Sequence, residues 1–129
     1  MRQWAVATDV PVLIVDDQAP FRRAARAVVS ATPGFVVVDE AESGEAAVEL
    51  VDSLVPRLVL MDINMPGITG IEAARRITAA HPEVVVILLS TYQASDLPGD
   101  ARDCGAAAYI NKEAFEPQVV QDIWAEHAP

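Results

Sequence analysis

Cysteine and long apolar runs are what this sequence most clearly lacks. Its single cysteine, Cys104, cannot form a disulfide within the chain and favours a reducing compartment, so we expect a cytoplasmic protein. No stretch reaches the roughly 18 consecutive apolar residues of a membrane span. The start of the chain also lacks the apolar core of a signal peptide. We therefore expect no membrane partner.

Positive charge is also scarce. Nine lysines and arginines face 19 aspartates and glutamates, which gives a formal net charge of −10. A field of that sign repels the phosphate backbone, so we expect no direct nucleic acid contact by this chain. It suits a divalent cation or a basic partner instead. The arginine pairs Arg22-Arg23 and Arg75-Arg76 are interpreted as solvated helix faces.

The apolar residues are arranged in alternating short runs and helix-period segments. The 129 residues fit one domain, and a hydrophobic fraction of 52% excludes a disordered chain. This alternation predicts an α/β fold with a five-stranded parallel sheet and helices on both faces. The expected strands cover residues 12–15, 35–39, 58–61, 84–89 and 107–110, and the expected helices cover 20–30, 44–54, 69–80, 97–104 and 118–127.

Two parts of this arrangement are expected to be weakly held. Residues 1–10 are interpreted as an N-terminal extension that precedes a domain of residues 11–129. The helix over 97–104 carries Pro98-Gly99 in its first turn, where the glycine costs about 1 kcal/mol relative to alanine. We therefore expect this helix to be short and easily displaced.

The last predicted helix carries two apolar pairs, Val119 with Ile123 and Val120 with Trp124. We expect the first pair to face the core. The second pair either packs in the core as well or forms an exposed stripe. An exposed stripe would offer a surface for a partner, for example a homodimer through the last helix.

Acidic residues follow two of the predicted strands. Asp16 and Asp17 come directly after the run 12–15, and Asp62 follows the run 58–61. Because the carboxyl ends of parallel strands meet at one edge of a sheet, we expect these side chains to converge. Two carboxylates at about 4 Å repel by roughly 4 kcal/mol at an effective dielectric of 20. Mg²⁺, which prefers oxygen ligands, would offset that repulsion.

Three further groups are placed to complete a site at this edge. Lys112 follows the fifth predicted strand, Ser90 follows the fourth, and the backbone carbonyl of Asn64 lies in the loop after Asp62. A nucleophilic carboxylate, a metal and two donors are what phosphoryl transfer requires. The simpler alternatives are that Asp16 and Asp17 only cap the helix beginning near Pro20 and that Asp62 only caps a loop.

Taken together, these motifs resemble the receiver domain of two-component response regulators. The resemblance rests on Asp16-Asp17, on Asp62 within the segment 61–67, on Ser90, and on Lys112 at the end of 109–112. It covers nearly everything from residue 11 to the C-terminus. It implies a sheet of strand order 2-1-3-4-5 and a phosphorylation-controlled signalling switch. Such a domain catalyses only its own phosphotransfer and autodephosphorylation, so we do not expect an enzyme in the ordinary sense.

The resemblance also implies a role for each residue. Asp62 would accept a phosphoryl group from a histidine kinase or phosphotransfer domain. Asp17 and Asp62 would bind Mg²⁺ directly together with the Asn64 carbonyl, and Asp16 would hold a water of the metal. Ser90 and Lys112 would bind the phosphoryl oxygens. Tyr109 would act with Ser90 as the switch that remodels the face formed by 97–104, 107–110 and 118–127.

The sequence departs from the common receiver pattern at two positions. Glu113 stands where many receivers have a proline after the lysine, so a cis peptide is not expected there. This variant resembles receivers of transcription regulators with a helix-turn-helix domain. Thr91 stands where a very small residue is usual, and we expect Asn64, Thr91 and Tyr92 to modulate access to Asp62.

Two rival functions follow from the same residues. An aspartate-nucleophile phosphohydrolase would use a carboxylate and Mg²⁺, but typically with an Asp-x-Asp pattern on its first strand, where this chain has the adjacent acids Asp16-Asp17. A pseudo-receiver would signal by protein contact alone. Multiple-turnover hydrolysis of phosphate esters would favour the first rival, and the presence of all the expected site residues counts against the second.

Overall fold

The computed structural model describes residues 9–91 and 103–128. Five parallel strands form one sheet in the order β2-β1-β3-β4-β5, which confirms the predicted fold class and strand order. The strands are β1 (Val10–Val15), β2 (Phe35–Ala41), β3 (Leu58–Asp62), β4 (Val85–Ser90) and β5 (Ala108–Asn111). Tyr92 and most of the expected helix over 97–104 lie outside the described residues.

The central strands are buried on both faces, as their uninterrupted apolar runs predict. Every residue of β3 and β4 is buried, which is typical of parallel strands covered by helices on both sides. β2 lies at an edge, and its first four residues alternate between half-buried and exposed positions, with Val36 and Val38 exposed. β1 begins at Val10, earlier than predicted, because Val10 pairs with Phe35 and donates its N–H to the Gly34 carbonyl.

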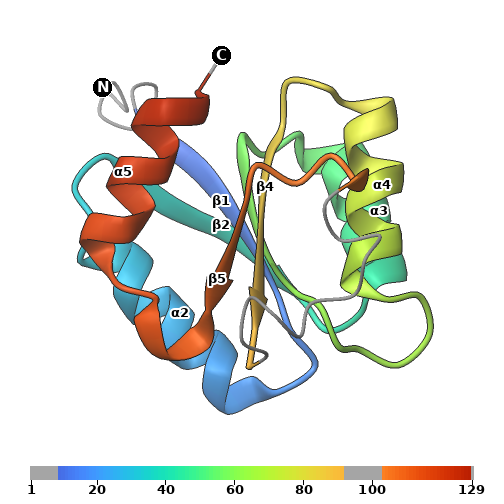
Figure 1. The fold of residues 1–129 in the computed structure, drawn as a ribbon, viewed down its shortest axis with the longest axis horizontal. Helices are drawn as coiled ribbons and strands as arrows, with labels where there is room; N and C mark the ends of the chain where they lie inside the picture. Colours follow the sequence, from blue (N-terminus) through green and yellow to red (C-terminus); the bar gives the residue numbers. More distant parts are fainter. Residues whose placement is uncertain (1–8, 92–102, 129) are drawn as a thin grey trace.

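Among the described residues, two helices cover each face of the sheet, as can be followed in Figure 1. α2 (Ala19–Ser30) and α5 (Pro117–His127) pack on one face, and α3 (Gly44–Leu54) and α4 (Gly70–Ala80) pack on the other. Ser43 caps α3, since its hydroxyl accepts the Ala46 N–H at 3.1 Å. Thr69 caps α4 in the same way through the Glu72 N–H. Side-chain acceptors at these positions satisfy otherwise unpaired helix N–H groups.

Both apolar pairs of α5 face the sheet. Val120 is fully buried, and Val119, Ile123 and Trp124 are half-buried against the same cluster. The Trp124 ring packs edge-on against Phe35, with ring centroids 6.1 Å apart, and lies 5.2 Å from the Arg57 guanidinium. The alternative of an exposed Val120-Trp124 stripe is therefore wrong, and the alternative of core packing is correct.

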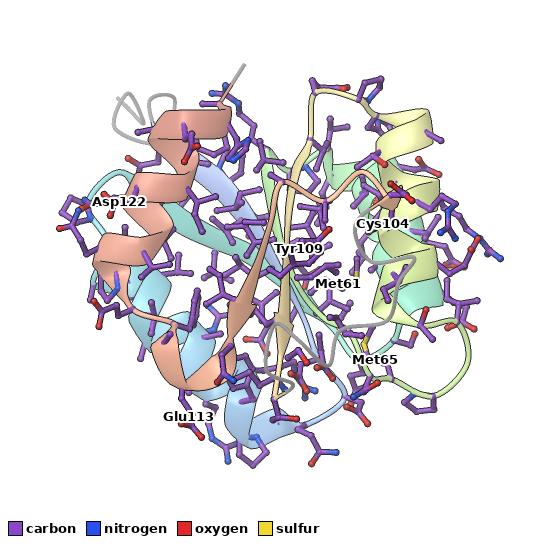
Figure 2. The ribbon with its side chains drawn as sticks, in the orientation of Figure 1. Met61, Met65, Cys104, Tyr109, Glu113 and Asp122 are labelled. Carbon is purple, nitrogen blue, oxygen red and sulfur yellow. The ribbon has the colours of Figure 1, made fainter. Side chains whose placement is uncertain are left out.

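The opposite face of the sheet holds the sulfur-containing side chains of the described residues, Met61, Met65 and Cys104. Figure 2 shows Met61, Met65, Cys104 and Tyr109 on the side covered by α3 and α4. Cys104 is 2% exposed, so it is the small buried apolar residue that an interior cysteine usually is. Within the described part of the chain, every helix is too short or too polar to span a bilayer.

Candidate functional site

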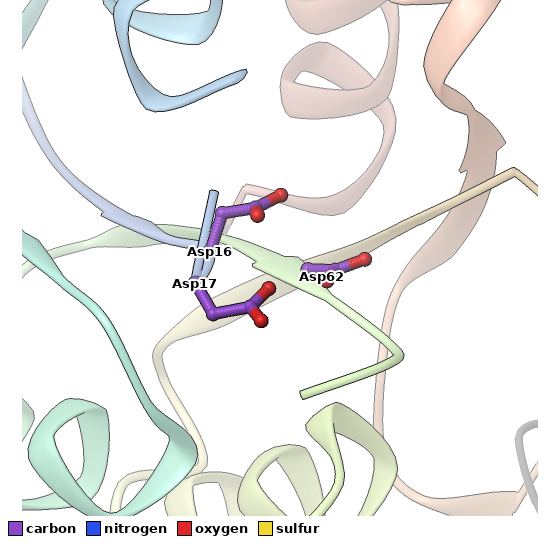
Figure 3. A group of neighbouring side chains, drawn as sticks. All are labelled: Asp16, Asp17 and Asp62. Atoms are coloured by element: carbon purple, nitrogen blue, oxygen red, sulfur yellow. The ribbon is translucent and has the colours of Figure 1, made fainter. Parts of the chain in front are cut away.

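Three aspartates converge at the carboxyl edge of the sheet, as the sequence predicts. Asp62 is the last residue of β3, and Asp16 and Asp17 directly follow β1. Each offers a carboxylate oxygen, and these oxygens lie within 4.8 Å of one another (Figure 3). Asp16 is fully buried and Asp62 is 6% exposed. Burying like charges this close is costly unless a cation compensates them.

Every polar group of Asp16 has a bonding partner within the chain. Its N–H donates to the Ala41 carbonyl, and its carbonyl accepts from Arg22 at 2.8 Å. One carboxylate oxygen accepts the Gln18 N–H at 2.8 Å, and the other accepts from Lys112 at 2.8 Å. The N-cap of α2 is Gln18, and its side chain makes no capping hydrogen bond. Asp16 therefore shapes the turn before α2, and the alternative of a simple helix cap is wrong for it.

Lys112 joins two of the three carboxylates. Its ammonium Nζ lies 2.8 Å from Asp16 Oδ2 and 3.3 Å from Asp62 Oδ1. It also lies 4.3 Å above the ring of Phe21, a contact that the sequence does not predict. Burial lowers the pKa of Lys112, but the hydrogen bond to Asp16 and the charges of Asp62 and Asp16 outweigh it and raise the pKa above its ordinary value. Lys112 is therefore charged throughout the neutral range.

The Asp62 carboxyl holds its proton more tightly than an ordinary aspartate. Burial raises its pKa from 3.8 to about 6, with a further contribution from the negative charge of Asp16. Lys112 and a backbone hydrogen bond from Asn64 act in the opposite direction. A perturbed carboxyl among charged neighbours is common at functional sites. Asp62 is ionised at neutral pH but at an energetic cost.

The loop between β3 and α4 is held close to Asp62. Gly70, at the start of α4, leaves no room for a Cβ because one would meet the Asp62 carbonyl. Gly67 has a φ of +80°, which favours glycine. Glu45 at the start of α3 accepts the Ile68 N–H at 3.2 Å. Asn64 is exposed in this loop, so its backbone lies at the rim of the site.

Ser90, Thr91 and Tyr109 lie on the β4–β5 side of the site. Ser90 is the last residue of β4 and is 3% exposed, and it pairs in register with Asn111 of β5. Thr91 is exposed directly after it. Tyr109 on β5 pairs with Leu88 and is half-buried against the cluster under α3 and α4. Tyr92, the remaining residue expected to modulate access, lies outside the described residues.

Arg22 is a neighbour of the site, and the prediction that it lies on a solvated helix face is wrong. Its side chain is only 14% exposed and contacts Glu40 on β2 at 3.1 Å as well as the Asp16 carbonyl. Arg23, the next residue, is exposed as predicted. No signal in the sequence distinguishes the two, because the partner on Asp16 is a backbone carbonyl and the partner on β2 is distant along the chain.

The residues at this edge suit a hard divalent cation. Three carboxylates face a single ammonium, which leaves an excess of two negative charges. All the available ligand atoms are oxygens, and Mg²⁺ is typically held by one or two carboxylates with water and phosphate oxygens. The donor set therefore fits Mg²⁺.

Most of the sequence is similar to a known protein family and to curated proteins. Residues 12–123 match the family model of the response regulator receiver domain. The transcriptional regulatory protein DegU from Brevibacillus brevis is 38% identical over 123 residues, which are 95% of this chain and 52% of DegU. The response regulator UvrY from Escherichia coli (strain K12) is 38% identical over 114 residues, 88% of this chain and 52% of UvrY. The chain thus spans about half the length of these relatives.

Solved structures of receiver domains are similar to this chain as well. The signal receiver domain of NarL from Mycobacterium tuberculosis has a TM-score of 0.81 at 29% identity, covering 88% of this chain and 94% of that chain. A chain of the CheX–CheY–BeF3–Mg²⁺ complex from Borrelia burgdorferi has a TM-score of 0.83 at 26% identity, covering 98% of this chain and 96% of that chain. Domains of this kind are signalling domains and not enzymes in the ordinary sense. The chain belongs to the response regulator receiver domain family.

Proposed function

We propose that this chain is a phosphorylation-controlled switch in which Asp62 accepts a phosphoryl group from a histidine kinase or phosphotransfer domain. The observation that carries the proposal is the cluster of Asp16, Asp17 and Asp62, of which the first and last are buried, with the Lys112 ammonium bonded to these two. A cluster of this kind supplies a nucleophile, a cation site and a fixed positive charge at one edge of the sheet.

The proposed cation is Mg²⁺. Asp17, Asp62 and the backbone carbonyl of Asn64 hold it directly, and Asp16 holds one of its waters. When bound, the cation neutralises charge on the carboxylates and on the phosphoryl oxygens. This assignment is supported by the half-buried position of Asp17 and by the full burial of Asp16 against Gln18 and Lys112.

In the proposed transfer, an oxygen of the ionised Asp62 carboxylate attacks the phosphorus of a phosphohistidine. The new P–O bond forms as the P–N bond breaks, and the leaving imidazole takes the electron pair of that bond and then a proton from solvent. Lys112 and the Ser90 hydroxyl bind the equatorial oxygens, where charge is spread during transfer. Hydrolysis of the resulting acyl phosphate by water restores the carboxylate, which is the domain's slow autodephosphorylation.

Ser90 and Tyr109 form the proposed switch. Movement of Ser90 toward the phosphoryl group would change the packing of Tyr109 and the surface of β5 and α5, together with residues 97–104. The population shifts to the active conformation if the contacts of the phosphoryl group contribute more free energy than the amount that favours the inactive conformation. The expected homodimer through α5 loses its support, because Val120 and Trp124 pack against the chain's own sheet and form no exposed stripe.

The proposed output is regulation of transcription, carried out in the cytoplasm. DegU is named a transcriptional regulatory protein, and this chain spans about half of it. The negative charge of the chain, −10, argues that its 129 residues do not touch nucleic acid themselves.

Phosphorylation by acetyl phosphate tests the proposal. With Mg²⁺, intact-mass analysis should show one added phosphoryl group that is stable to acid and labile to base. Asp62→Asn should show none, whereas Asp122→Asn, which alters an exposed aspartate of α5, should be labelled like the wild type. Equal labelling of Asp62→Asn would move the site elsewhere. Steady hydrolysis of phosphate esters would favour the phosphohydrolase, and no labelling of the wild type would favour the pseudo-receiver.

A further inference from the structure

Arg22 connects the cation-binding turn to the neighbouring strand. Its Nη1 donates to the backbone carbonyl of Asp16 at 2.8 Å, and its Nε lies 3.1 Å from Glu40 Oε1 on β2. Its Nη2 lies 3.7 Å from Glu42. A planar guanidinium can make these contacts together because its donors form a rigid fork. The turn that carries Asp16 is thus fastened to β2 through one side chain.

The position of Arg22 is unfavourable by local criteria. It is the fourth residue of α2, and the first turn of that helix contains no acidic residue. A cation near a helix N-terminus opposes the helix dipole, and its side chain is only 14% exposed. A solvated arginine would avoid both costs. The contacts to Asp16 and Glu40 supply the compensation.

We propose that Arg22 is a positioning residue for the cation site, an inference that rests on the proposed function. The carbonyl of Asp16 is fixed by Arg22, and its carboxylate is fixed by Gln18 and Lys112. Without Arg22 the peptide joining Asp16 to Asp17 can rotate. The carboxylate of Asp17 then loses its orientation toward the other two. Residues that orient metal ligands in this way typically contribute tenfold or more to metal affinity.

Electrostatics alone predicts the opposite sign. Arg22 is a positive charge beside a cation site, so removing it without a structural effect would strengthen Mg²⁺ binding. A positioning role predicts that its removal weakens Mg²⁺ binding. The direction of the change therefore separates the two explanations, whatever its size.

Arg22→Gln is the primary variant, and Arg22→Lys the second. Lysine keeps the charge but lacks the rigid planar fork of donors by which Arg22 reaches Asp16 and Glu40, so any weakening in this variant is geometric. Arg23→Gln removes an exposed charge from the same turn, and Arg26→Gln removes the other arginine bonded to Glu40, at 2.7 Å. Mg²⁺ affinity is measured from thermal melts over a series of Mg²⁺ concentrations. Amide exchange at Gln18 is measured in EDTA, and phosphorylation by acetyl phosphate at limiting and saturating Mg²⁺.

We expect Arg22→Gln to raise the apparent Kd for Mg²⁺ by about tenfold and Arg22→Lys to raise it as well. Gln18 exchange should be faster in both, and phosphorylation should return to within about twofold of the wild type at saturating Mg²⁺. Arg23→Gln and Arg26→Gln should keep the wild-type affinity. Unchanged or tighter binding in both Arg22 variants overturns the inference, as does equal weakening in Arg26→Gln. A wild-type chain that neither binds Mg²⁺ nor is phosphorylated overturns the proposed function itself.

Discussion

Asp62→Asn should make the metal-free protein more stable at neutral pH. The pKa of Asp62 rises from 3.8 to about 6 in the folded chain, first because of burial and then because of Asp16. One pKa unit corresponds to about 1.4 kcal/mol, so keeping Asp62 ionised in the folded state costs about 3 kcal/mol. Asparagine has nearly the same shape without the charge. The asparagine amide weakens the interaction that Asp62 makes with Lys112, and this loss offsets part of the gain. We therefore expect the free energy of unfolding to rise by about 1–3 kcal/mol.

The pH dependence follows from the direction of the shift. Because the folded state binds the Asp62 proton more tightly than the unfolded state, protonation stabilises the wild type below about pH 4. That advantage is lost as the pH rises through about 6. The stability gap between Asp62→Asn and the wild type should therefore be small at pH 4, grow between pH 4 and 6, and stay constant above that range.

Urea unfolding in EDTA at several pH values measures this gap. Asp122→Asn, at an exposed position of α5, serves as the control and should show no such gap. Saturating Mg²⁺ should stabilise the wild type by about 2.7 kcal/mol at 100 times its Kd and so narrow or reverse the difference. The reasoning is refuted if Asp62→Asn is less stable than the wild type at pH 7.5 in EDTA, or if the gap does not change between pH 4 and 7.

Four further predictions concern other residues. Mg²⁺ should raise the melting temperature of the wild type relative to EDTA and leave that of Asp17→Ala unchanged; identical wild-type melts would exclude the cation site. Thr91→Ala should speed phosphorylation by acetyl phosphate, dephosphorylation, or both, because a smaller side chain opens the route to Asp62; unchanged rates would remove the steric argument. Val55→Gly should stabilise the fold by up to about 1 kcal/mol in urea unfolding, because Val55 has a φ of 46° that costs a branched residue about 1–2 kcal/mol. Its side chain is 48% exposed, and a loss of stability would show that this side chain matters more than the backbone conformation. Beryllofluoride with Mg²⁺ should change amide exchange across residues 91–112, and changes confined to the loop after Asp62 would end the switch proposal while leaving phosphate acceptance.

The convergence of the site could be predicted because it depends on topology. Asp16, Asp17, Asp62, Ser90 and Lys112 each follow an apolar run, and in a parallel sheet the run ends meet at one edge. The alternation of runs and helical segments was enough to predict that sheet. Strand limits were less predictable, as Val10 shows, because they depend on pairing with residues distant along the chain.

The wrong predictions concern side chains whose partners are not encoded locally. At 3.6 residues per turn, positions 119, 120, 123 and 124 span an arc of about 140°, and periodicity cannot say whether a sheet covers all of it. Trp124 is covered because Phe35 and Arg57 meet it there. Arg22 was misplaced because the direction of the Asp16 carbonyl cannot be read from the sequence.

Lys112 is the only lysine in the sequence, and its ammonium lies between Asp16 and Asp62. Protein labelled with ¹⁵N-lysine therefore carries a single side-chain nitrogen label, and that label lies inside the site. Its NMR resonance would report directly on ion binding, on changes in Asp62 and on the protonation of the ammonium. No mutation is needed to isolate the signal, so the native chain contains its own spectroscopic probe of the chemistry proposed for it.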